Sequence, residues 1–265
     1  MAETTRPLPA PIAARTDPVL VLRIAIIAAL ILIWEAVAAS GLLFRDVVPS
    51  LVAIGAALVQ LLLDPAFYRN LGITVGEVGL ALAIGGVSGL AAGIALGGSP
   101  FLARAYEPFI YYLGPTPKII FFPVMIMLFG VGPGSKVAMG ALSCFFPIAI
   151  SAAGGMRQIE KVLVRVGRSF RASRWQMLTK IYLPAMRQPI VNGIRLGLGV
   201  AIIGTLLAET KLSNQGLGYL VIQTYTTFDM PRMYALLIAL FALAIGANAL
   251  IGRLGQPGGP GKATR

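Results

Sequence analysis

Residues 73–98 read ITVGEVGLALAIGGVSGLAAGIALGG, and this stretch sets the class of the fold. Its only charged residue is Glu77, and about 20 apolar residues are enough for a helix to cross the hydrocarbon core of a bilayer. Glycine recurs at every fourth position and so occupies one helix face: Gly85, Gly89, Gly93 and Gly97. Small residues let helices approach closely in lipid. We therefore predict a membrane-spanning helix packed closely inside one subunit, although the same face would also suit a contact between subunits.

The composition excludes several classes of protein. The chain is 57% hydrophobic and 12% charged, with a mean hydropathy of +0.82, whereas soluble domains are about 45–50% apolar and about 25% charged. Its net charge of +12 does not indicate nucleic-acid binding, because most Lys and Arg lie between apolar segments rather than on one soluble face. Without histidine, and with Cys144 as its single cysteine, the chain has no His/Cys metal site, Cys-His nucleophile pair or disulfide framework.

Apolar segments recur along the chain and predict an all-α integral membrane protein with about six transmembrane helices. The other five predicted spans are 19–39, 107–131, 136–156, 190–209 and 232–253. The stretch 50–63 is too short to span and is expected at the outer surface, and 99–106 is expected to be a loop. These segments form a membrane domain over 19–253, flanked by a disordered basic cytoplasmic arm (1–18) and a disordered Gly/Pro tail (254–265).

Two of these spans have special features. Ala36-Val37-Ala38 looks like a signal-peptide cleavage site, but the run before it is long enough to stay in the membrane as a span. The third span carries four prolines, which break or kink a helix: Pro108, Pro115, Pro117 and Pro123. Backbone groups freed at membrane depth must be buried in protein or line a cavity.

The distribution of Lys and Arg predicts the orientation, because cytoplasmic loops carry more of them. With the N-terminus inside, 15 of the 22 fall on the cytoplasmic side and 5 on the outer side. The inner set is Arg6, Arg15, Arg23, Arg104, Arg157, Lys161, Arg165, Arg168, Arg171, Arg174, Lys180, Arg187, Arg253, Lys262 and Arg265. The outer set is Arg45, Arg69, Lys136, Lys211 and Arg232. Both termini and the loop 157–187 are therefore expected in the cytoplasm.

The loop 157–187 is patterned, unlike an ordinary connection. A mainly apolar stripe recurs at spacings of three or four residues, which we interpret as one stripe of a helical surface: Val162, Val166, Phe170, Ser173, Met177 and Ile181. Ser173 and Gln176 have the spacing of a capping box. The pattern predicts a short amphipathic helix, a turn at about 171–173 and a second helix that stops at Leu183-Pro184. A helix lying on anionic lipid is the alternative interpretation.

The spacing in this loop resembles the cytoplasmic signature of binding-protein-dependent ABC permeases, in which a glycine is followed by nine residues and then I-x-L-P. Ile181-Tyr182-Leu183-Pro184 matches the end of that signature, and Ala172 to Gln176 resemble the family's "GASRWQ". Arg171 stands where the family usually has glycine, and Arg165-Val166-Gly167 stands where it commonly has E-A-A.

Further stretches resemble the nitrate, sulfonate and taurine branch of that family. They are Trp34-Glu35, Pro115-Thr116-Pro117-Lys118, Phe129-Gly130-Val131-Gly132 with Ser135-Lys136, Phe145-Phe146-Pro147, Gly193-Ile194-Arg195, Ala208-Glu209, and Gly216-Leu217-Gly218-Tyr219-Leu220. The resemblance covers about 30–253. It implies an importer subunit in the bacterial inner membrane that carries a small, anionic, nitrate-, sulfonate- or taurine-like solute.

The resemblance also implies partners. It predicts a second permease copy, cytoplasmic ATPase subunits and a substrate-binding protein outside the membrane. The chain has no GxxxxGK[ST] phosphate loop, so it is expected to be no enzyme and to bind no cofactor, with ATP-Mg bound by the separate ATPase. The loop residues expected to contact that ATPase are Arg165, Val166, Gly167, Phe170, Arg171, Ala172, Ser173, Ile181, Leu183 and Pro184.

Ionisable residues inside the apolar spans are candidates for the translocation pathway, because a charge at the centre of a membrane helix is costly. Glu77 and Glu107 qualify, and the pathway candidates are Pro115, Thr116, Pro117, Lys118, Arg195 and Glu209. Lys118 either faces an anionic substrate or pairs with backbone beside the prolines. Arg195 and Glu209 suit packing or gating. An ion-coupled secondary transporter and a non-transporting scaffold are the alternative functions, but we find no internal repeat of the kind such carriers often show.

Overall fold

The computed structural model describes residues 18–41 and 47–255, and within them the chain forms helices and connecting loops without a strand. The arm 1–17 and the tail 256–265 lie outside the described residues. The helices are α1 (Pro18–Ser40), α2 (Leu51–Leu63), α3 (Pro65–Gly98), α4 (Pro100–Leu113), η1 (Lys118–Phe121), α5 (Phe122–Phe129), α6 (Pro133–Arg157), α7 (Lys161–Ser169), α8 (Arg174–Gln176), η2 (Met177–Tyr182), α9 (Leu183–Ala185), α10 (Arg187–Lys211), α11 (Leu217–Thr226) and α12 (Met230–Gly255).

Five of these helices are long and apolar enough to cross a membrane: α1, α3, α6, α10 and α12. A bent pair, Pro100–Leu113 with Lys118–Phe129, whose two halves meet at 94°, brings the number to six when it is counted as one broken span. The all-α membrane fold with about six spans is thus confirmed. The expectation that 99–106 is a loop is wrong, because Ser99 caps a helix there by accepting a hydrogen bond from the Leu102 amide, and Pro100 suits the first turn.

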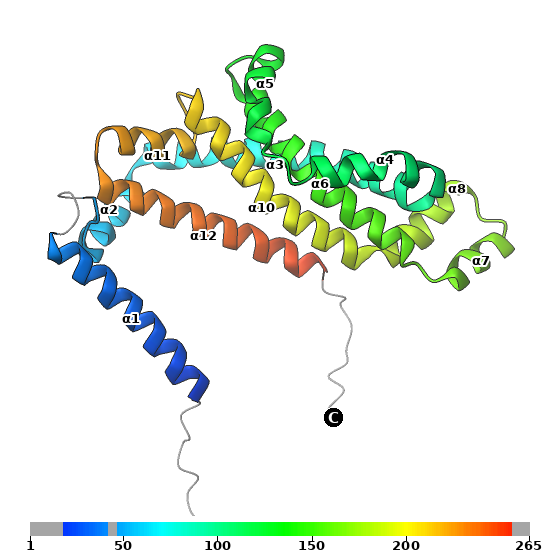
Figure 1. Cartoon of the computed structure of the whole chain (residues 1–265), viewed down its shortest axis with the longest axis horizontal. Coiled ribbons are helices and arrows are strands. Elements are labelled where there is room, and N and C mark those ends of the chain that lie inside the picture. The colour runs from blue at the N-terminus through cyan, green and yellow to red at the C-terminus, as the bar shows by residue number, and fades with distance from the viewer. Residues whose placement is uncertain (1–17, 42–46, 256–265) are drawn as a thin grey trace, which may run out of the picture.

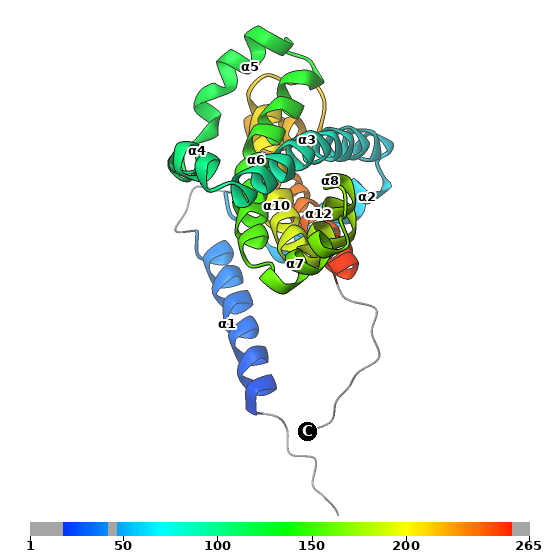
Figure 2. The ribbon, with the colours of Figure 1, turned by 90° about the vertical axis from the view of Figure 1, so that its right-hand side faces the viewer.

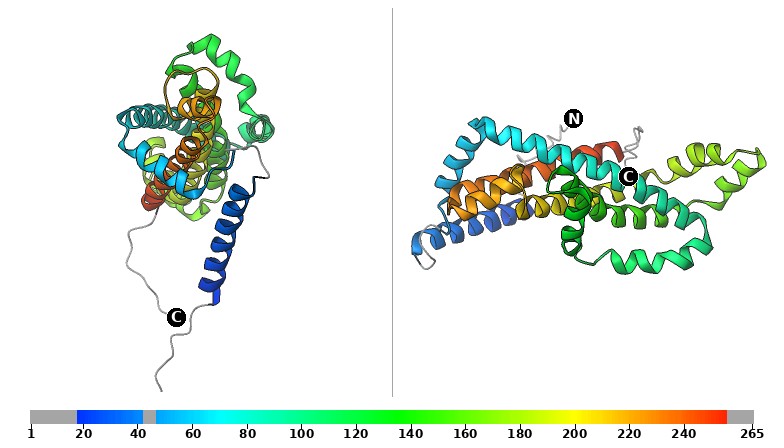
Figure 3. Two further views of the ribbon diagram at one scale, coloured as in Figure 1. Left: turned by 90° about the vertical axis from the view of Figure 1, so that its left-hand side faces the viewer. Right: turned by 90° about the horizontal axis from the view of Figure 1, so that it is seen from above.

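The long helices α3, α6, α10 and α12 lie roughly side by side, and different short helices lie at the two ends of this bundle (Figure 1). The short helices α2 and α11 lie at one end, and α7 and α8 project from the other (Figures 1 and 3). The helix α5 projects from the side of the bundle (Figure 2), but Phe122 at its start is buried against Met139 of α6 and Ala208 of α10. The helix α1 diverges from it and has no buried residue, but its end is tied down: the Trp34 indole donates to the Pro49 carbonyl at 3.0 Å, and Glu35 accepts from the Leu51 amide at 2.6 Å.

The core is built on the contact between α3 and α6, which packs the glycine face of α3 against backbone of α6. A Cβ on Gly89 would lie 2.7 Å from the Phe145 carbonyl oxygen, and one on Gly93 would lie 2.5 Å from that of Ala149. Gly85 and Gly97 meet the carbonyls of Ala141 and Ala153 in the same way. Each partner lies 56 positions after its glycine, so the two helices run parallel in constant register. The glycine face therefore packs inside one subunit, as predicted.

The third span is broken rather than kinked. Residues 114–117 leave the helical path between α4 and η1. Pro115 and Pro117 explain the break, because proline has no amide hydrogen and its ring clashes with the preceding turn of a helix. Thr116 stabilises the end of α4 by donating its hydroxyl to the Tyr112 carbonyl at 3.1 Å. The predicted non-helical backbone is confirmed at this position.

The segment 157–187 forms two short helical arms, as predicted. The second arm opens with the predicted capping box: the Gln176 amide donates to the Ser173 hydroxyl at 3.2 Å, and the Ser173 amide donates to the Gln176 side chain at 2.8 Å. This arm passes through the π-helix η2 into α9 and ends after Ala185 rather than at Leu183-Pro184. Pro184 is tolerated because it lies in the first turn of α9.

Arg171 joins the two arms in the left-handed conformation, with φ of 52°. The Ala172 amide donates to the Gly167 carbonyl at 3.0 Å and the Arg171 amide donates to the Arg168 carbonyl at 2.9 Å. This pair of bonds is the Schellman ending of a helix, in which the left-handed position usually holds glycine. Arg171 therefore holds a conformation that a side chain with a Cβ adopts only with strain.

Gly93→Ala should destabilise the protein, because its Cβ would meet the Ala149 carbonyl oxygen and the Ala152 Cβ at 2.5 Å each. Overpacking of this kind costs about 1–3 kcal/mol. Gly76→Ala is the matched control on the same helix, since nothing lies within 4 Å of its added Cβ. Thermal unfolding of the purified variants in detergent measures the difference. Equal melting temperatures would contradict the close α3–α6 packing.

Arg171→Gly should stabilise the segment by about 1 kcal/mol, because glycine adopts a positive φ without the Cβ penalty. Arg168→Gly is the control: it lies in the last turn of α7 with an ordinary helical φ, so glycine there should destabilise. Amide hydrogen exchange of residues 161–176 reports both changes. Faster exchange in Arg171→Gly would show that the Arg171 side chain supports the turn by a contact that outweighs its strain.

Candidate functional site

The surface of the 157–187 segment carries a row of exposed apolar side chains. Val162, Val166 and Phe170 follow one another at every fourth position of α7 and its end, with exposed fractions of 59%, 48% and 82%. Trp175 at the start of the second arm is exposed as well. We name Val162, Val166 and Phe170 the apolar ridge. Because the segment projects from the bundle (Figure 3), the ridge is open to a partner.

The predicted stripe divides into an outer and an inner part, which corrects our interpretation of it as one surface. Met177 is buried and Ile181 is half-buried, and both lie where a Cβ on Gly167 would stand. Gly167 is therefore needed at the crossing of the two arms. Four of the predicted loop residues belong to the connections of the segment: Ala172 and Ser173 form the turn, and Leu183 and Pro184 lead into α10.

The ridge is surrounded by positive charge. Arg165, Arg168, Arg171 and Arg174 are all exposed. Among the described residues, the two side-chain ion pairs join Arg157 to Glu107 and Arg232 to Asp64, so none of these four arginines forms one. The segment thus offers an apolar ridge within a basic field, which suits a protein surface with an apolar cleft and acidic side chains.

The break in the third span places Lys118 among backbone and aromatic groups. Its ammonium donates to the carbonyl of Gly114, which has lost its backbone amide donor because the helix breaks there. The ammonium also lies 5.0 Å from the centre of the Phe146 ring. Lys118 is half-buried. Of the two roles predicted for it, these contacts support pairing with backbone beside Pro115 and Pro117.

Glu209 lies in a buried polar cluster between α3, α10 and α11. Its carboxylate accepts from the Thr74 hydroxyl at 2.7 Å and from the Gly218 amide at 2.6 Å, and the Thr74 hydroxyl accepts from the Leu217 amide at 2.8 Å. A Cβ on Gly216, where φ is 100°, would lie 2.5 Å from that carboxyl group. The Gly-Leu-Gly sequence therefore allows the first amides of α11 to approach Glu209.

The sequence reasoning missed Asn70 and Thr74, which complete this cluster. The Gly216 amide donates to the Asn70 side chain at 2.7 Å. Asn70, Thr74 and Glu77 recur at spacings of four and three, which places three polar side chains on one face of an apolar helix. This spacing was the feature of the sequence from which the polar cluster could have been predicted. Arg195, the remaining pathway candidate, donates to the Asn248 side chain at 2.9 Å and so ties α10 to α12.

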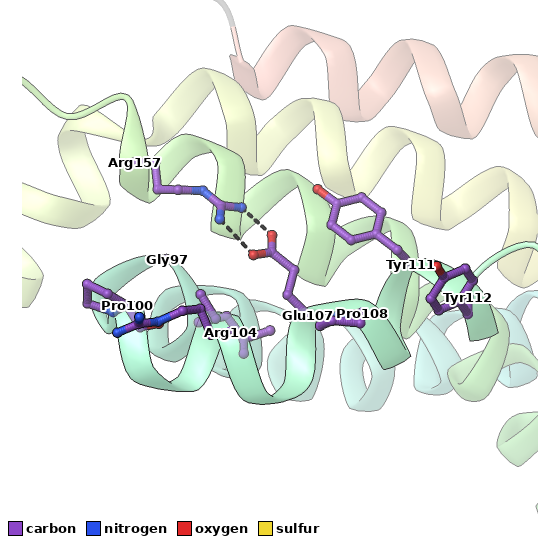
Figure 4. Close-up of a pocket in the computed structure, with 10 residues that line it drawn as sticks. Gly97, Pro100, Arg104, Glu107, Pro108, Tyr111, Tyr112 and Arg157 are labelled. Carbon is purple, nitrogen blue, oxygen red and sulfur yellow. Dashed lines mark hydrogen bonds and ion pairs between the residues drawn. The ribbon is translucent and has the colours of Figure 1, made fainter.

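A cavity of about 780 Å³ lies between α4 and the ends of α3 and α6 near the 157–187 segment. Glu107 and Arg157 form a two-bonded ion pair across it, at 2.8 and 2.5 Å (Figure 4). Tyr111 and Arg104 also line the cavity. Arg157 on α6 therefore neutralises the Glu107 carboxylate, which explains how a charged residue is stabilised within this apolar segment.

Comparison with known proteins gives a consistent result. Residues 85–256 match the family described as "Binding-protein-dependent transport system inner membrane component". The taurine transport system permease protein TauC of Escherichia coli (strain K12) is 30% identical over 88% of each chain. A putative aliphatic sulfonates transport permease protein of Bacillus subtilis (strain 168) is 30% identical over 78% of this chain and 75% of its own. A nitrate import permease protein of Synechococcus elongatus is 24% identical over 85% and 86%.

The fold is similar to that of a solved transporter. A chain of the MetNI methionine ABC transporter in an inward-facing conformation aligns with a TM-score of 0.64 and 20% identity, over 76% of this chain and 98% of its own. The family match covers more than half of the chain, including the broken span, the basic segment with its apolar ridge, and Glu209 with the start of α11. The chain therefore belongs to the family of inner membrane components of binding-protein-dependent transport systems.

Proposed function

We propose that this chain is the membrane-spanning permease subunit of an ATP-driven importer whose cargo is a small anion of the sulfonate or nitrate type. The observation that carries the proposal is the apolar ridge on a helical segment that projects from the bundle. An ion-coupled secondary transporter would have no use for a docking surface of this form. The cargo is inferred from relatives that are named for taurine, aliphatic sulfonates and nitrate.

The proposed assembly has three kinds of component: permease, ATPase and substrate-binding protein. ATPase subunits bind ATP-Mg and contact the 157–187 segment from the cytoplasm, a second copy of the permease completes the pore, and a substrate-binding protein docks outside. This chain then hydrolyses no ATP. The excess of Lys and Arg at the end that carries α7 supports a cytoplasmic position for that segment and for both termini.

The pathway is proposed to run past the break in the third span. Pro115, Thr116 and Pro117 leave the helical path there, and Lys118 holds the carbonyl that the break frees. The contacts of Arg195 and Glu209 favour a different role, since both side chains tie helices of this subunit together.

Phe170→Asp should separate the permease from its ATPase. Truncating a buried aromatic anchor at an interface costs about 2 kcal/mol or more, which corresponds to roughly 30-fold weaker binding. The expected result is normal membrane insertion, no co-purification of co-expressed ATPase subunits, and uptake at background. Phe228→Asp is the matched control, because Phe228 is an exposed phenylalanine at the opposite end of the molecule with a φ of 61°. Normal co-purification with Phe170→Asp would contradict the docking role and would favour the alternative, a helix that lies on the lipid surface.

Lys118→Met should lower uptake and the melting temperature of the complex together, because it leaves the Gly114 carbonyl without its donor. Lys118→Arg, which keeps a charged donor, is the control. The assay is uptake of labelled taurine, an alkanesulfonate and nitrate, alongside thermal unfolding. A loss of uptake with an unchanged melting temperature would contradict the structural role and would assign the charge of Lys118 to the path of the anion.

A further inference from the structure

We propose that Glu77 and Glu209 form a buried proton-binding site, in which the two carboxyl groups share one proton that resides on Glu77. The site lies where α3, α6, α10 and the start of α11 meet. It is defined by burial, hydrogen-bond partners and charge, and does not depend on the transport activity proposed above.

Glu209 is the acceptor of the pair. The residue is completely buried, and its carboxyl oxygens receive the Thr74 hydroxyl and the Gly218 amide. Both partners donate, and hydrogen bonds to a carboxylate favour its ionised form. If Glu209 were protonated, its carboxyl group would be a weaker acceptor. The buried Thr74 and Gly218 donors would then lose part of their hydrogen bonding.

Glu77 is the partner that carries the proton. It is 5% exposed and lies one helical turn after Thr74, whose hydroxyl donates to Glu209 at 2.7 Å, so Glu77 and Glu209 lie on the same buried interface between α3 and α10. We infer that the two carboxyl groups are joined by a hydrogen bond, which requires one of them to supply the hydrogen because ionised carboxylates are acceptors only. The Oε2 atom of Glu77 is buried and has no partner among the described residues. A neutral carboxyl group tolerates that lack of a partner far better than a carboxylate does.

Lys136 sets the charge balance of the site. It is buried on α6, where its ammonium donates to the carbonyls of Val131 and Gly132. It lies one turn before Gly140, where a Cβ would meet Ala81 of α3 and Thr205 of α10, each one turn from a glutamate of the pair, so its charge lies near both carboxyl groups. The start of α11 contributes amide groups only. Two carboxylates and one ammonium would leave a net charge of −1 inside the bundle. One shared proton brings the net charge to zero, which a low-dielectric interior strongly favours.

The proton has a structural consequence, because Glu209 also holds the first turn of α11. Loss of the proton would set two carboxylates against each other and push α3 from α10. The helix α11 and the loop before it would then lose their anchor on Glu209 and Thr74. The site thus makes the packing of this end of the molecule dependent on one bound proton.

The test compares Glu77→Gln with Glu209→Gln in the purified full chain. In Glu77→Gln the new amide group can donate to Glu209 as the protonated acid does, so we expect a melting temperature close to that of the unsubstituted protein. In Glu209→Gln the new amide group must turn toward the Thr74 and Gly218 donors, so we expect a fall of about 4 °C or more. A fall in Glu77→Gln as large as that in Glu209→Gln would overturn the assignment of the proton to Glu77.

Infrared spectroscopy keeps the proposal testable if Glu209→Gln does not fold. The spectrum of the unsubstituted protein minus that of Glu77→Gln should contain the carbonyl band of a protonated carboxylic acid, which shifts on deuterium exchange. The absence of this band would overturn the proposal. So would a melting temperature that rises with sodium concentration in the unsubstituted protein but not in Glu77→Gln, since a bound cation would then take the place of the proton.

A pH series gives a third, independent result. Near neutral pH the folded protein binds one proton more at this site than the unfolded chain does, so stability should fall as the pH rises. Between mildly acidic and mildly alkaline buffer, the melting temperature of the unsubstituted protein should therefore drop relative to that of Glu77→Gln. Parallel pH profiles of the two proteins would contradict the shared proton.

Discussion

The contact between α3 and α6 cannot depend on the hydrophobic effect, because lipid tails are as apolar as the side chains of both helices. Close packing of the two helix backbones stabilises the contact instead. Four glycines of α3 meet four carbonyl groups of α6 with a constant offset of 56 positions, so dispersion contacts accumulate from Gly85 to Gly97 on α3 and from Ala141 to Ala153 on α6. The remaining elements are arranged on this pair. α10 packs against both helices, α12 covers α10, and the broken span connects the end of α3 to the start of α6.

Departures from regular helix occur where a side chain or a short turn satisfies the backbone. The break at Pro115 and Pro117 is held by Thr116 and by Lys118, which donates to the carbonyl that the break frees. The first amides of α11 are held by Glu209 and Thr74. In a membrane domain these partners are required, since no water in the hydrocarbon core can replace them. The same requirement explains why charged residues within the spans, such as Lys118 and Glu209, have specific partners in this subunit.

The 157–187 segment follows different physics, because it lies beyond the ends of the spans. Its inner face is tied by Gly167 against Met177 and Ile181, and its turn is closed by two backbone bonds with Arg171 in a left-handed conformation. This internal order keeps the outer face apolar and exposed at Phe170. A rigid segment loses little entropy on docking, which suits a surface that must transmit movement between two subunits.

Apolar run length and the Lys and Arg pattern were enough to predict an all-α membrane domain of about six spans, and the glycine spacing predicted a closely packed helix face. Ser173 and Gln176 predicted the capping box, because a cap is a local interaction between residues three apart. The sequence did not reveal that α4 begins at Pro100, since a Ser-Pro start also suits a turn. Nor could it show that Met177 and Ile181 turn inward, that the two halves of the third apolar segment meet at 94°, or that the faces of α3, α6 and α10 that carry Glu77, Lys136 and Glu209 pack together. Those features join residues that are far apart in the chain or depend on the direction in which two helices cross, and only the packing of the whole bundle decides them.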